Sequence, residues 1–308
     1  MKVLVAGGAG FIGSHVVDML LEKGNEVIVL DNSPEGNNLH HLNGNKNLTV
    51  INADLNNLSE LKKTMNGVDE VYHLAANSDI QSGGKNPEID FKNTFMTTKN
   101  ILDAMVANDV KKIFFSSTSA VYGNITGIAL KEDTGGLSPI SYYGAAKLSS
   151  EALISSYSYM NDIGALIFRF PNVVGPRVTH GVIFDFMRKL KDNPKKLEIL
   201  GDGKQNKEYI YVHDLIKAIS SVSIPTSGVE TYNVSTESSI SVMQIADIVC
   251  EKLGLKNVKY SFTGGNIGWK GDVPSFKYDI SKIKKTGWMY QHSSTDAIKM
   301  TLRNLLDG

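Results

Sequence analysis

The sequence has little of several features that would each define a class of protein. Its 308 residues contain one cysteine, Cys250, so no internal disulfide can form, which is typical of a reducing compartment. Lysine plus arginine and aspartate plus glutamate number 32 each, so the chain lacks the basic excess that binds nucleic acid nonspecifically. No apolar run approaches the roughly 18 residues that a membrane span needs. We therefore expect a cytoplasmic protein whose partners include neither nucleic acid nor a membrane.

Metal-binding and targeting signals are equally scarce. The seven histidines show no spacing typical of metal ligands, so we expect no metal site. The first apolar stretch starts at Val3 and runs directly into a glycine turn, which predicts a β-strand rather than a signal peptide. The composition does provide 42% hydrophobic residues, enough for the core of an ordinary globular protein with one or two domains.

The first half of the chain alternates short apolar segments with amphipathic ones. A parallel sheet with helices on both faces produces this alternation, so we predict an α/β protein with a doubly wound parallel sheet. One long helix is expected from about Asp90 to Ala107. The expected strands are 2–7, 26–31, 48–55, 68–76, 110–119 and 165–175.

The rhythm breaks after about Pro171, where loops lengthen and glycine and lysine become commoner. We expect residues 1–170 to form a first domain and residues 171–308 to form mainly a smaller second lobe. The chain is expected to return to the first domain around residues 212–235.

A glycine pattern lies between the first expected strand and the first expected helix. Gly7, Gly10 and Gly13 occur in "VLVAGGAGFIGSHVV", where glycine lets the backbone approach a pyrophosphate at the helix N-terminus. The same spacing recurs at 265, 268 and 271, but no helix-like segment follows there. The simpler alternative for the first copy is a tight turn without a ligand. The context favours dinucleotide binding.

Acidic residues at the ends of the next two strands indicate which dinucleotide is bound. Asp31 ends the second strand, 24 residues after Gly7, where a carboxylate can accept both adenosine-ribose hydroxyls. A carboxylate there repels a 2′-phosphate, and Asn32 supplies no compensating cation, so NAD is favoured over NADP. Asp54 ends the third strand and could meet the adenine, although a helix cap or a solvated turn explains it equally well.

Two tyrosine–lysine pairs have the i, i+4 spacing that places side chains on one helix face. One pair is Tyr143 and Lys147, and the other is Tyr278 and Lys282. A tyrosine beside a fixed positive charge can act as a base near neutral pH. We expect Tyr278 to be a surface coincidence, because it follows an irregular loop.

The end of the fifth strand favours the first pair. Ligands bind beyond the carboxyl ends of parallel strands, so Ser117, Thr118 and Ser119 are expected to point toward the cofactor. The helix with Tyr143 begins one connection later, which brings it to the same edge. Tyr142, its neighbour, is expected to be a packing residue.

These motifs resemble those of the extended short-chain dehydrogenases/reductases, in their NAD-dependent epimerase/dehydratase group. Within the group the chain is most similar to UDP-glucose (UDP-galactose) 4-epimerases of the archaeal type. The resemblance covers nearly all of the chain, and it implies a Rossmann-type sheet with a smaller C-terminal substrate-binding α/β lobe. It rests on "GGAGFIGSH", "LDN", "HLAAN", "FSSTSAVYG", "SYYGAAK", "FRFPNVVGPR" and "GWKGDVP".

The resemblance also implies a catalytic mechanism. Tyr143 would be the acid/base, Lys147 its partner and a ligand of the nicotinamide ribose, and Thr118 the hydroxyl between Tyr143 and the sugar. The sugar 4-hydroxyl would lose its proton as hydride passes to NAD⁺, and the 4-keto sugar would turn over and regain hydride on its other face. We expect Lys147 and the nicotinamide charge to lower the pKa of Tyr143 from its usual value of about 10.

Further contacts follow from the resemblance. Substrate contacts would be made by Thr118, Asn172, Val182 and Lys207. Cofactor contacts, including those argued above, would be made by Gly7, Gly10, Phe11, Ile12, Gly13, Asp31, Asn32, Asp54, Leu55, Leu74, Ala75, Ala76, Asn93, Ser116, Tyr143, Lys147 and Pro171.

Differences from related enzymes at individual motif positions narrow the range of expected reactions. Related 4,6-dehydratases carry an Asp-Glu pair directly after the threonine, and related uronic-acid decarboxylases carry a glutamate there. This chain has Ser119 and Ala120, and alanine transfers no proton, so an epimerase or a simple reductase is favoured. Two positions where related enzymes hold the diphosphate with arginine are Lys207 and Ile267 here, and lysine lacks the bidentate fork of arginine.

The leading hypothesis is NAD-dependent C4 epimerisation of a nucleotide sugar, with a UDP-sugar as the expected substrate. One alternative is an NAD(H)-dependent reductase or dehydrogenase of a nucleotide sugar, and another is a noncatalytic dinucleotide-binding protein. The resemblance also implies a homodimer formed through the helices near 90–107 and 143–160.

Overall fold

The structure is a computed structural model that describes residues 1–32, 38–77, 79–125, 127–273 and 275–307. The chain divides into two compact units. The first unit comprises Met1–Gly123, Gly135–Arg169 and Ile219–Tyr232, and the second comprises Asn124–Thr134, Phe170–Ala218 and Asn233–Gly308. The cofactor and substrate roles expected for residues 1–170 and 171–308 stay predictions.

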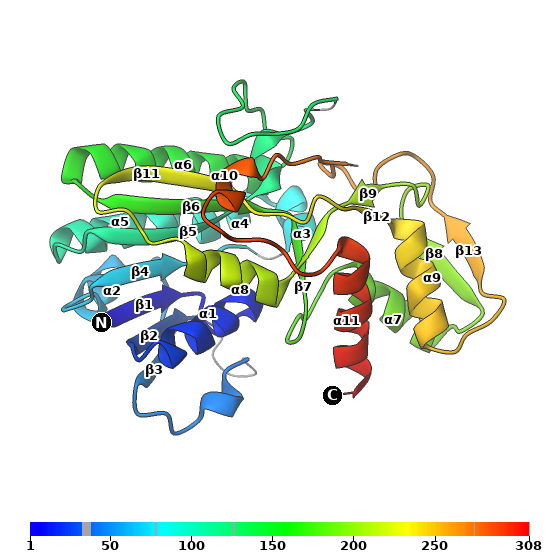
Figure 1. Cartoon of the computed structure of the whole chain (residues 1–308), viewed down its shortest axis with the longest axis horizontal. Coiled ribbons are helices and arrows are strands. Elements are labelled where there is room, and N and C mark those ends of the chain that lie inside the picture. The colour runs from blue at the N-terminus through cyan, green and yellow to red at the C-terminus, as the bar shows by residue number, and fades with distance from the viewer. Residues whose placement is uncertain (33–37, 78, 126, 274, 308) are drawn as a thin grey trace. The chain divides into compact units, whose positions relative to one another are not determined.

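A seven-stranded sheet organises the first unit, with the order β11-β6-β5-β4-β1-β2-β3 (Figure 1). The pairings of β1 with β2 and β4, of β2 with β3 and of β4 with β5 are all parallel, so these five strands end at one edge. The predicted doubly wound α/β fold is confirmed. The strands are β1 (Lys2–Ala6), β2 (Glu26–Asp31), β3 (Leu48–Asn52), β4 (Glu70–His73), β5 (Lys112–Thr118), β6 (Gly164–Phe170) and β11 (Gly228–Asn233).

Helices cover this sheet because alternate strand residues present apolar side chains to each face. On one face, Leu4, Val71 and Phe115 belong to a buried cluster that also contains Leu61 and Ile101 from the helices. The helices of the first unit are α1 (Phe11–Glu22), α2 (Leu58–Thr64), α3 (Ile80–Lys85), α4 (Pro87–Asp90), α5 (Thr97–Ala107) and α6 (Tyr142–Asn161), with shorter helical segments η1 (His40–Leu42), η2 (Phe91–Met96) and η3 (Ser119–Tyr122).

The single helix expected from Asp90 to Ala107 is instead a composite. The segment η2 between α4 and α5 is a π-helix, whose turns are wider than those of an α-helix. Two threonine hydroxyls donate to backbone carbonyls here: Thr97 to that of Asn93 at 3.1 Å, and Thr98 to that of Thr94 at 2.7 Å. Apolar periodicity could not reveal this change, because it does not report where hydroxyl groups bind.

The described residues of the second unit form three small two-stranded sheets and their own apolar core. Its strand pairs are β7 (Asn172–Val174) with β10 (Tyr209–Tyr211), β9 (Asn206–Lys207) with β12 (Ile240–Ser241), and β8 (Lys196–Ile199) with β13 (Lys259–Phe262). Its helices are α7 (Val182–Asp192), α9 (Val242–Lys252), α10 (Ser281–Lys284) and α11 (Ser294–Asp307), and α8 (Val212–Ser221) begins in it. Cys250 on α9 is buried and has a free thiol. No helix in the described part of the chain has the length and apolarity needed to cross a membrane.

Candidate active site

The glycine turn joins β1 to α1, and its three glycines have different functions. Gly7 has a φ of +79°, and a Cβ on it would lie 2.6 Å from the Ala75 nitrogen. A Cβ on Gly13 would lie 2.0 Å from the Gly7 carbonyl oxygen. These two glycines therefore allow the turn itself to form. At the exposed Gly10, a Cβ would meet only the Gly7 oxygen, at 3.4 Å.

Gly10 leaves an open surface where an anion can bind. It is the N-cap of α1 and supplies no side-chain cap, so the first backbone N–H groups of the helix are accessible from this side. A helix N-terminus with accessible N–H groups attracts phosphate oxygens. The turn thus has the shape and the polarity that the pyrophosphate of a dinucleotide requires.

Asp31 lies beside this turn at the end of β2. One carboxylate oxygen of Asp31 accepts a hydrogen bond of 3.0 Å from the Ala9 N–H, so the carboxylate is tied to the glycine turn. Asp54 serves a local turn, because its Oδ1 accepts from the N–H and the side-chain amide of Asn56, both at 2.9 Å. A contact of Asp54 with adenine stays a prediction, as does one of Asn32, whose neighbours 33–37 lie outside the described residues.

The remaining expected cofactor residues occupy varied environments. The N–H groups of Leu74 and Ala75 donate to the Ala6 carbonyl at 2.8 and 2.9 Å, so the chain after β4 runs against the glycine turn. Asn93 is exposed on η2, whereas Leu55 is buried in the core of the first unit. Phe11 and Ile12 form the first turn of α1, Ala76 is half-buried three residues after β4, and Ser116 lies within β5.

The helix α6 brings Tyr143 and Lys147 to the end of β5. Ser141 caps this helix by accepting from the Gly144 N–H at 3.1 Å. A Cβ on Gly144 would lie 2.6 Å from the Ala120 carbonyl oxygen, so glycine lets the helix start approach η3 closely. Thr118 lies close enough to the Tyr143 hydroxyl to lower its pKa, as expected of a threonine between this tyrosine and a bound sugar.

Lys147 is enclosed between α6 and β5. Its side chain is 2% exposed, and its ammonium donates to the Ser116 carbonyl at 2.7 Å. The Nζ atom lies 4.6 Å from the centre of the Phe115 ring and 6.0 Å from that of Tyr143. The fold therefore gathers Tyr143, Lys147 and Thr118 at one place.

Burial moves the pKa values of the two α6 residues in opposite directions. Loss of hydration, with a smaller contribution from the Asp90 carboxylate, raises the pKa of Tyr143 to about 12, although the Thr118 hydrogen bond lowers it. Burial lowers the pKa of Lys147 to about 7, against the opposing carboxylate of Glu151. The expected fall in the tyrosine pKa is therefore wrong for the groups of this chain, because desolvation and the Asp90 carboxylate outweigh the effect of Thr118. The positive charge of the nicotinamide in bound NAD is still expected to lower the pKa of Tyr143.

Comparison with known proteins decides the family. A model of the NAD dependent epimerase/dehydratase family matches residues 3–235, which include the glycine turn and the Tyr143–Lys147 pair. The chain belongs to this family. NAD is accordingly the cofactor of this family member, and the glycine turn with Asp31 fits it.

Relatives and solved structures agree with this assignment. The chain is 34% identical over 96% of both chains to a Methanocaldococcus jannaschii protein provisionally named UDP-glucose 4-epimerase. A solved UDP-galactose 4-epimerase is 35% identical, with a TM-score of 0.87 and 100% and 99% of the two chains covered. The Bacillus cereus UDP-glucuronic acid 4-epimerase, solved with UDP-glucuronic acid and NAD, is 29% identical with a TM-score of 0.89 at the same coverage. Family members that match also include decarboxylases and a dehydratase.

Several residues of this epimerase/dehydratase-family site escaped the sequence argument. Ser117 does not face the cofactor edge, because strand alternation turns its hydroxyl inward to donate to Glu151. Glu151 in turn holds Arg169 of β6 in a buried ion pair of 2.6 Å. The spacing of Glu151, four residues after Lys147, was an available signal, whereas the pairing with Arg169 was not.

Asp90 is a second overlooked group of the site. Its side chain is 1% exposed, and Oδ1 accepts from the Asn77 amide at 2.9 Å. Oδ2 has no hydrogen-bond partner among the described residues. Burial raises the pKa of Asp90, and its negative charge opposes ionisation of Tyr143.

Two expectations about other tyrosines are wrong. Tyr278 is buried, at 3% exposure, rather than on the surface, and it precedes α10, so it shares no helix with Lys282. Tyr142 is 52% exposed rather than packed, because it is the first residue of α6.

Apart from Thr118, which is in the first unit, the expected substrate residues of this family member lie in the second unit. Lys207 on β9 forms an ion pair with the buried carboxylate of Asp272, whose other oxygen accepts from the Gly268 N–H at 3.1 Å. Ile267 is 37% exposed and carries no charge. Asn172 is exposed at the start of β7, Val182 is half-buried at the start of α7, and Pro171 is buried between β6 and β7. Contacts of these residues with cofactor or substrate stay predictions.

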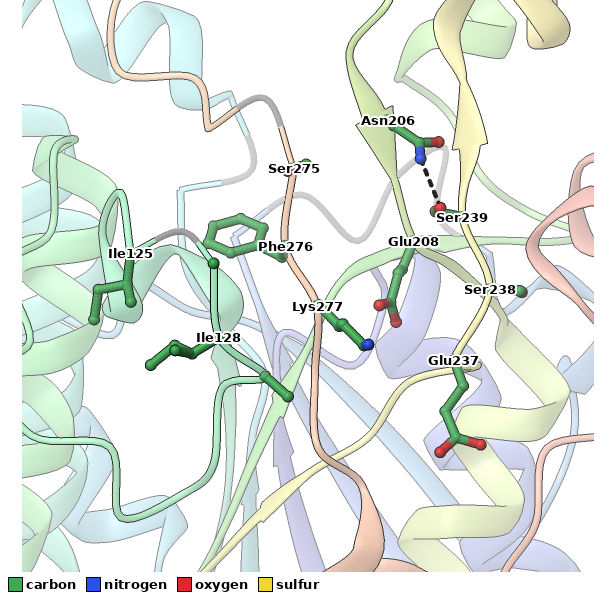
Figure 2. A pocket seen from close by; sticks show the side chains of 12 residues that line it. Ile125, Ile128, Asn206, Glu208, Glu237, Ser238, Ser239, Ser275, Phe276 and Lys277 are labelled. Atoms are coloured by element: carbon green, nitrogen blue, oxygen red, sulfur yellow. Dashed lines mark hydrogen bonds between the residues drawn. The ribbon is translucent and has the colours of Figure 1, made fainter.

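The second unit also contains a cavity of about 480 Å³ (Figure 2). The side chains of Glu208, Glu237 and Lys277 lie around it. Burial raises the pKa of Glu208 to about 7, although hydrogen bonds from Ser235 and from backbone N–H groups oppose the rise. Lys207, the residue before Glu208, is not part of its lining, because successive strand residues point to opposite faces.

Proposed function

We propose that this protein interconverts nucleotide sugars at C4, with UDP-glucose and UDP-galactose as the expected pair, through a transient 4-keto sugar. The observation that carries the proposal is that Tyr143, Lys147 and Thr118 lie together at the edge of a sheet whose glycine turn fits NAD. The names of the relatives support a UDP-sugar substrate.

Each group has a defined task in this reaction. NAD, when bound, accepts hydride from the sugar C4 and returns it. Tyr143 removes the proton of the 4-hydroxyl and later restores it, and Thr118, which lies beside Tyr143, orients the 4-hydroxyl. Lys147 supplies positive charge beside the phenol and a donor for the nicotinamide ribose. A planar 4-keto sugar that turns over before hydride returns gives the C4 epimer.

The residues after Thr118 argue against elimination or decarboxylation. Both reactions need a further acid or base beside Thr118, and Ser119 and Ala120 occupy those positions. Ala120 instead donates its backbone N–H to the Thr118 hydroxyl at 3.2 Å, which orients that hydroxyl. Epimerisation requires only the groups that are present.

Product analysis tests the proposal. Purified protein is incubated separately with UDP-galactose, UDP-N-acetylgalactosamine and UDP-glucuronic acid, without added cofactor, and the products are resolved by NMR. We expect one of these sugars to be converted to its C4 epimer. A net reduction that occurs only with added NADH would instead identify a reductase.

The matched control is Tyr143→Phe, which removes the acid/base but keeps the ring. We expect turnover to fall by about 10²- to 10⁴-fold while NAD affinity stays within about twofold. Unchanged turnover in this variant would remove Tyr143 from the mechanism.

A further inference from the structure

A buried ion pair begins one helical turn after Lys147 on α6. Arg169 of β6 and Glu151 of α6 are 6% and 7% exposed. The guanidinium donates two hydrogen bonds to the carboxylate, one from Nη2 to Oε2 at 2.6 Å and one from Nε to Oε1 at 3.0 Å. Apolar side chains of similar volume often stabilise a core as well as a buried ion pair does, so stability alone is a weak reason for this pair.

The surrounding groups fix the Glu151 carboxylate in one position. Ser117 of β5 donates its hydroxyl to Glu151. Arg169 also donates to the Tyr122 hydroxyl at 3.1 Å, and its guanidinium lies 5.0 Å from the centre of that ring. Two strands and the segment η3 therefore hold the carboxylate in place.

Glu151 occupies the next turn of α6 after Lys147, on the same face of the helix. The other groups that face Lys147 carry no charge: the Ser116 carbonyl and the Phe115 ring are neutral, and Tyr143 keeps its proton near neutral pH. Burial, and then the charge of Lys147, lowers the pKa of His73 on β4, so this imidazole is neutral as well. Asp90 acts on Tyr143, and Glu151 is the carboxylate that opposes the loss of charge at Lys147.

We propose that Glu151, clamped by Arg169 and Ser117, is a positioning residue that keeps the Lys147 ammonium charged and directed at the Ser116 carbonyl. The clamp prevents the carboxylate from swinging away from α6, so that its field at Lys147 is constant. The consequence for catalysis rests on the proposed function, in which a charged Lys147 holds the ribose and stands beside Tyr143. The effect on the charge of Lys147 itself does not depend on the sugar.

A direct titration of Lys147 tests this inference. NMR of isotope-labelled lysine side chains in the NAD-loaded protein, with the Lys147 signal assigned by its loss in Lys147→Arg, gives the midpoint of its deprotonation. In Glu151→Gln we expect the midpoint to fall by about one pH unit or more, because a nearby opposite charge favours the charged form of a lysine. The alkaline limb of the pH–kcat/KM profile should move to lower pH by the same interval. Turnover below that limb should be largely retained.

Three further variants separate charge from packing. Ser117→Ala removes a hydrogen bond to Glu151 without removing its charge, so the midpoint should stay within a few tenths of a unit. Glu151→Asp retains the carboxylate and should recover most of the parent midpoint. If Glu151→Gln does not fold because Arg169 is left unpaired, the double variant Glu151→Gln/Arg169→Gln removes both charges and should still lower the midpoint.

An unchanged Lys147 midpoint in a folded variant without the Glu151 charge would overturn the inference, whatever the enzyme catalyses. A lowered midpoint in a protein that epimerises no UDP-sugar would keep the inference and refute the proposed function.

Discussion

Single side chains in this site work under a conflict between burial and charge. In the proposed mechanism Tyr143 loses a proton and Lys147 keeps one, yet burial raises the pKa of the first to about 12 and lowers that of the second to about 7. Both shifts oppose the charged forms that this mechanism uses. Thr118 and Glu151 act against these shifts, since Thr118 lowers the pKa of Tyr143 and Glu151 raises that of Lys147.

The first residue-scale prediction concerns Asp90. Its charge raises the pKa of Tyr143, so Asp90→Asn should lower that pKa and move the acid limb of the pH–kcat/KM profile to lower pH, by up to about one unit. The rate rises with pH as the phenol ionises, so activity below the parent limb should increase. The exposed Asp109, changed to Asn, is the matched control and should leave the limb in place. A limb that moves upward in Asp90→Asn would contradict this assignment.

The second residue-scale prediction concerns the ion pair of the second unit. Asp272 neutralises Lys207, so Asp272→Asn should strengthen UDP binding roughly fivefold, about 1 kcal/mol, by freeing the cation. Asparagine can still accept from the Gly268 N–H, which protects the loop. Calorimetric titration with UDP in the presence of NAD measures the change. Lys207→Met is the companion variant and should weaken binding, and equal affinities in all three proteins would exclude Lys207 as a phosphate ligand.

Local chemistry explains which residues sequence could identify. Tyr143, Lys147 and Thr118 were accessible because helix spacing and the end of a strand place them, and the structure brings them together. Asp90 and Arg169 were not accessible, since each acts through a partner that is distant in the sequence. Even the direction of the tyrosine pKa shift was mistaken, because burial of the hydroxyl cannot be read from the spacing of two residues.

Among the helices, strands and turns, the apolar pattern of the sequence also predicts some elements and misses others. Strands β1 to β6 were predictable because most of their apolar residues are buried between layers of helices, whereas β11 was not among the expected strands. The π-helical segment η2 was not predictable either, because the hydrogen bonds of Thr97 and Thr98 to backbone carbonyls leave no apolar pattern. The glycine turn was predictable as an element, although only the structure separates the functions of its members.

The glycine turn yields an element-scale prediction with an internal control. Gly10→Ala should leave the thermal midpoint nearly unchanged, because the new methyl group meets only the Gly7 oxygen at 3.4 Å, yet it should weaken NAD binding by about tenfold or more by occupying the pyrophosphate surface. Gly13→Ala should destabilise the fold itself by about 1–3 kcal/mol, because its methyl group would lie 2.0 Å from the Gly7 oxygen. Thermal unfolding and NAD titration measure the two effects. Full NAD affinity in Gly10→Ala would place the pyrophosphate elsewhere.

The whole molecule consists of two units with different construction, a wide parallel sheet in one and three small strand pairs in the other. Sequence pattern predicted the first in detail because long apolar strands repeat there. It predicted the second only as a smaller lobe, because strands of two to four residues carry too little pattern. A role of the second unit in substrate binding stays a prediction.

The homodimer is the prediction that belongs to the whole molecule. Large apolar side chains are exposed on η2 and α6, including Phe91 at 54%, Tyr159 at 87% and Met160 at 76%. Burial of such side chains against a second copy would stabilise a dimer. Sedimentation at micromolar concentration should give twice the chain mass of 33.6 kDa, and Tyr159→Lys should shift the equilibrium toward the monomer. A monomeric parent protein would refute the expectation.

The hydrogen bond between Asp31 and the Ala9 N–H has a consequence for cofactor engineering. A designer who wishes to convert the enzyme to NADP would first replace Asp31, because its charge repels a 2′-phosphate. That change also removes the acceptor that anchors the pyrophosphate turn, so an apolar replacement would loosen the binding of either dinucleotide. Serine or asparagine, with a nearby arginine added for the phosphate, retains an acceptor for Ala9. The single side chain of Asp31 thus affects both the cofactor preference and the rigidity of the turn.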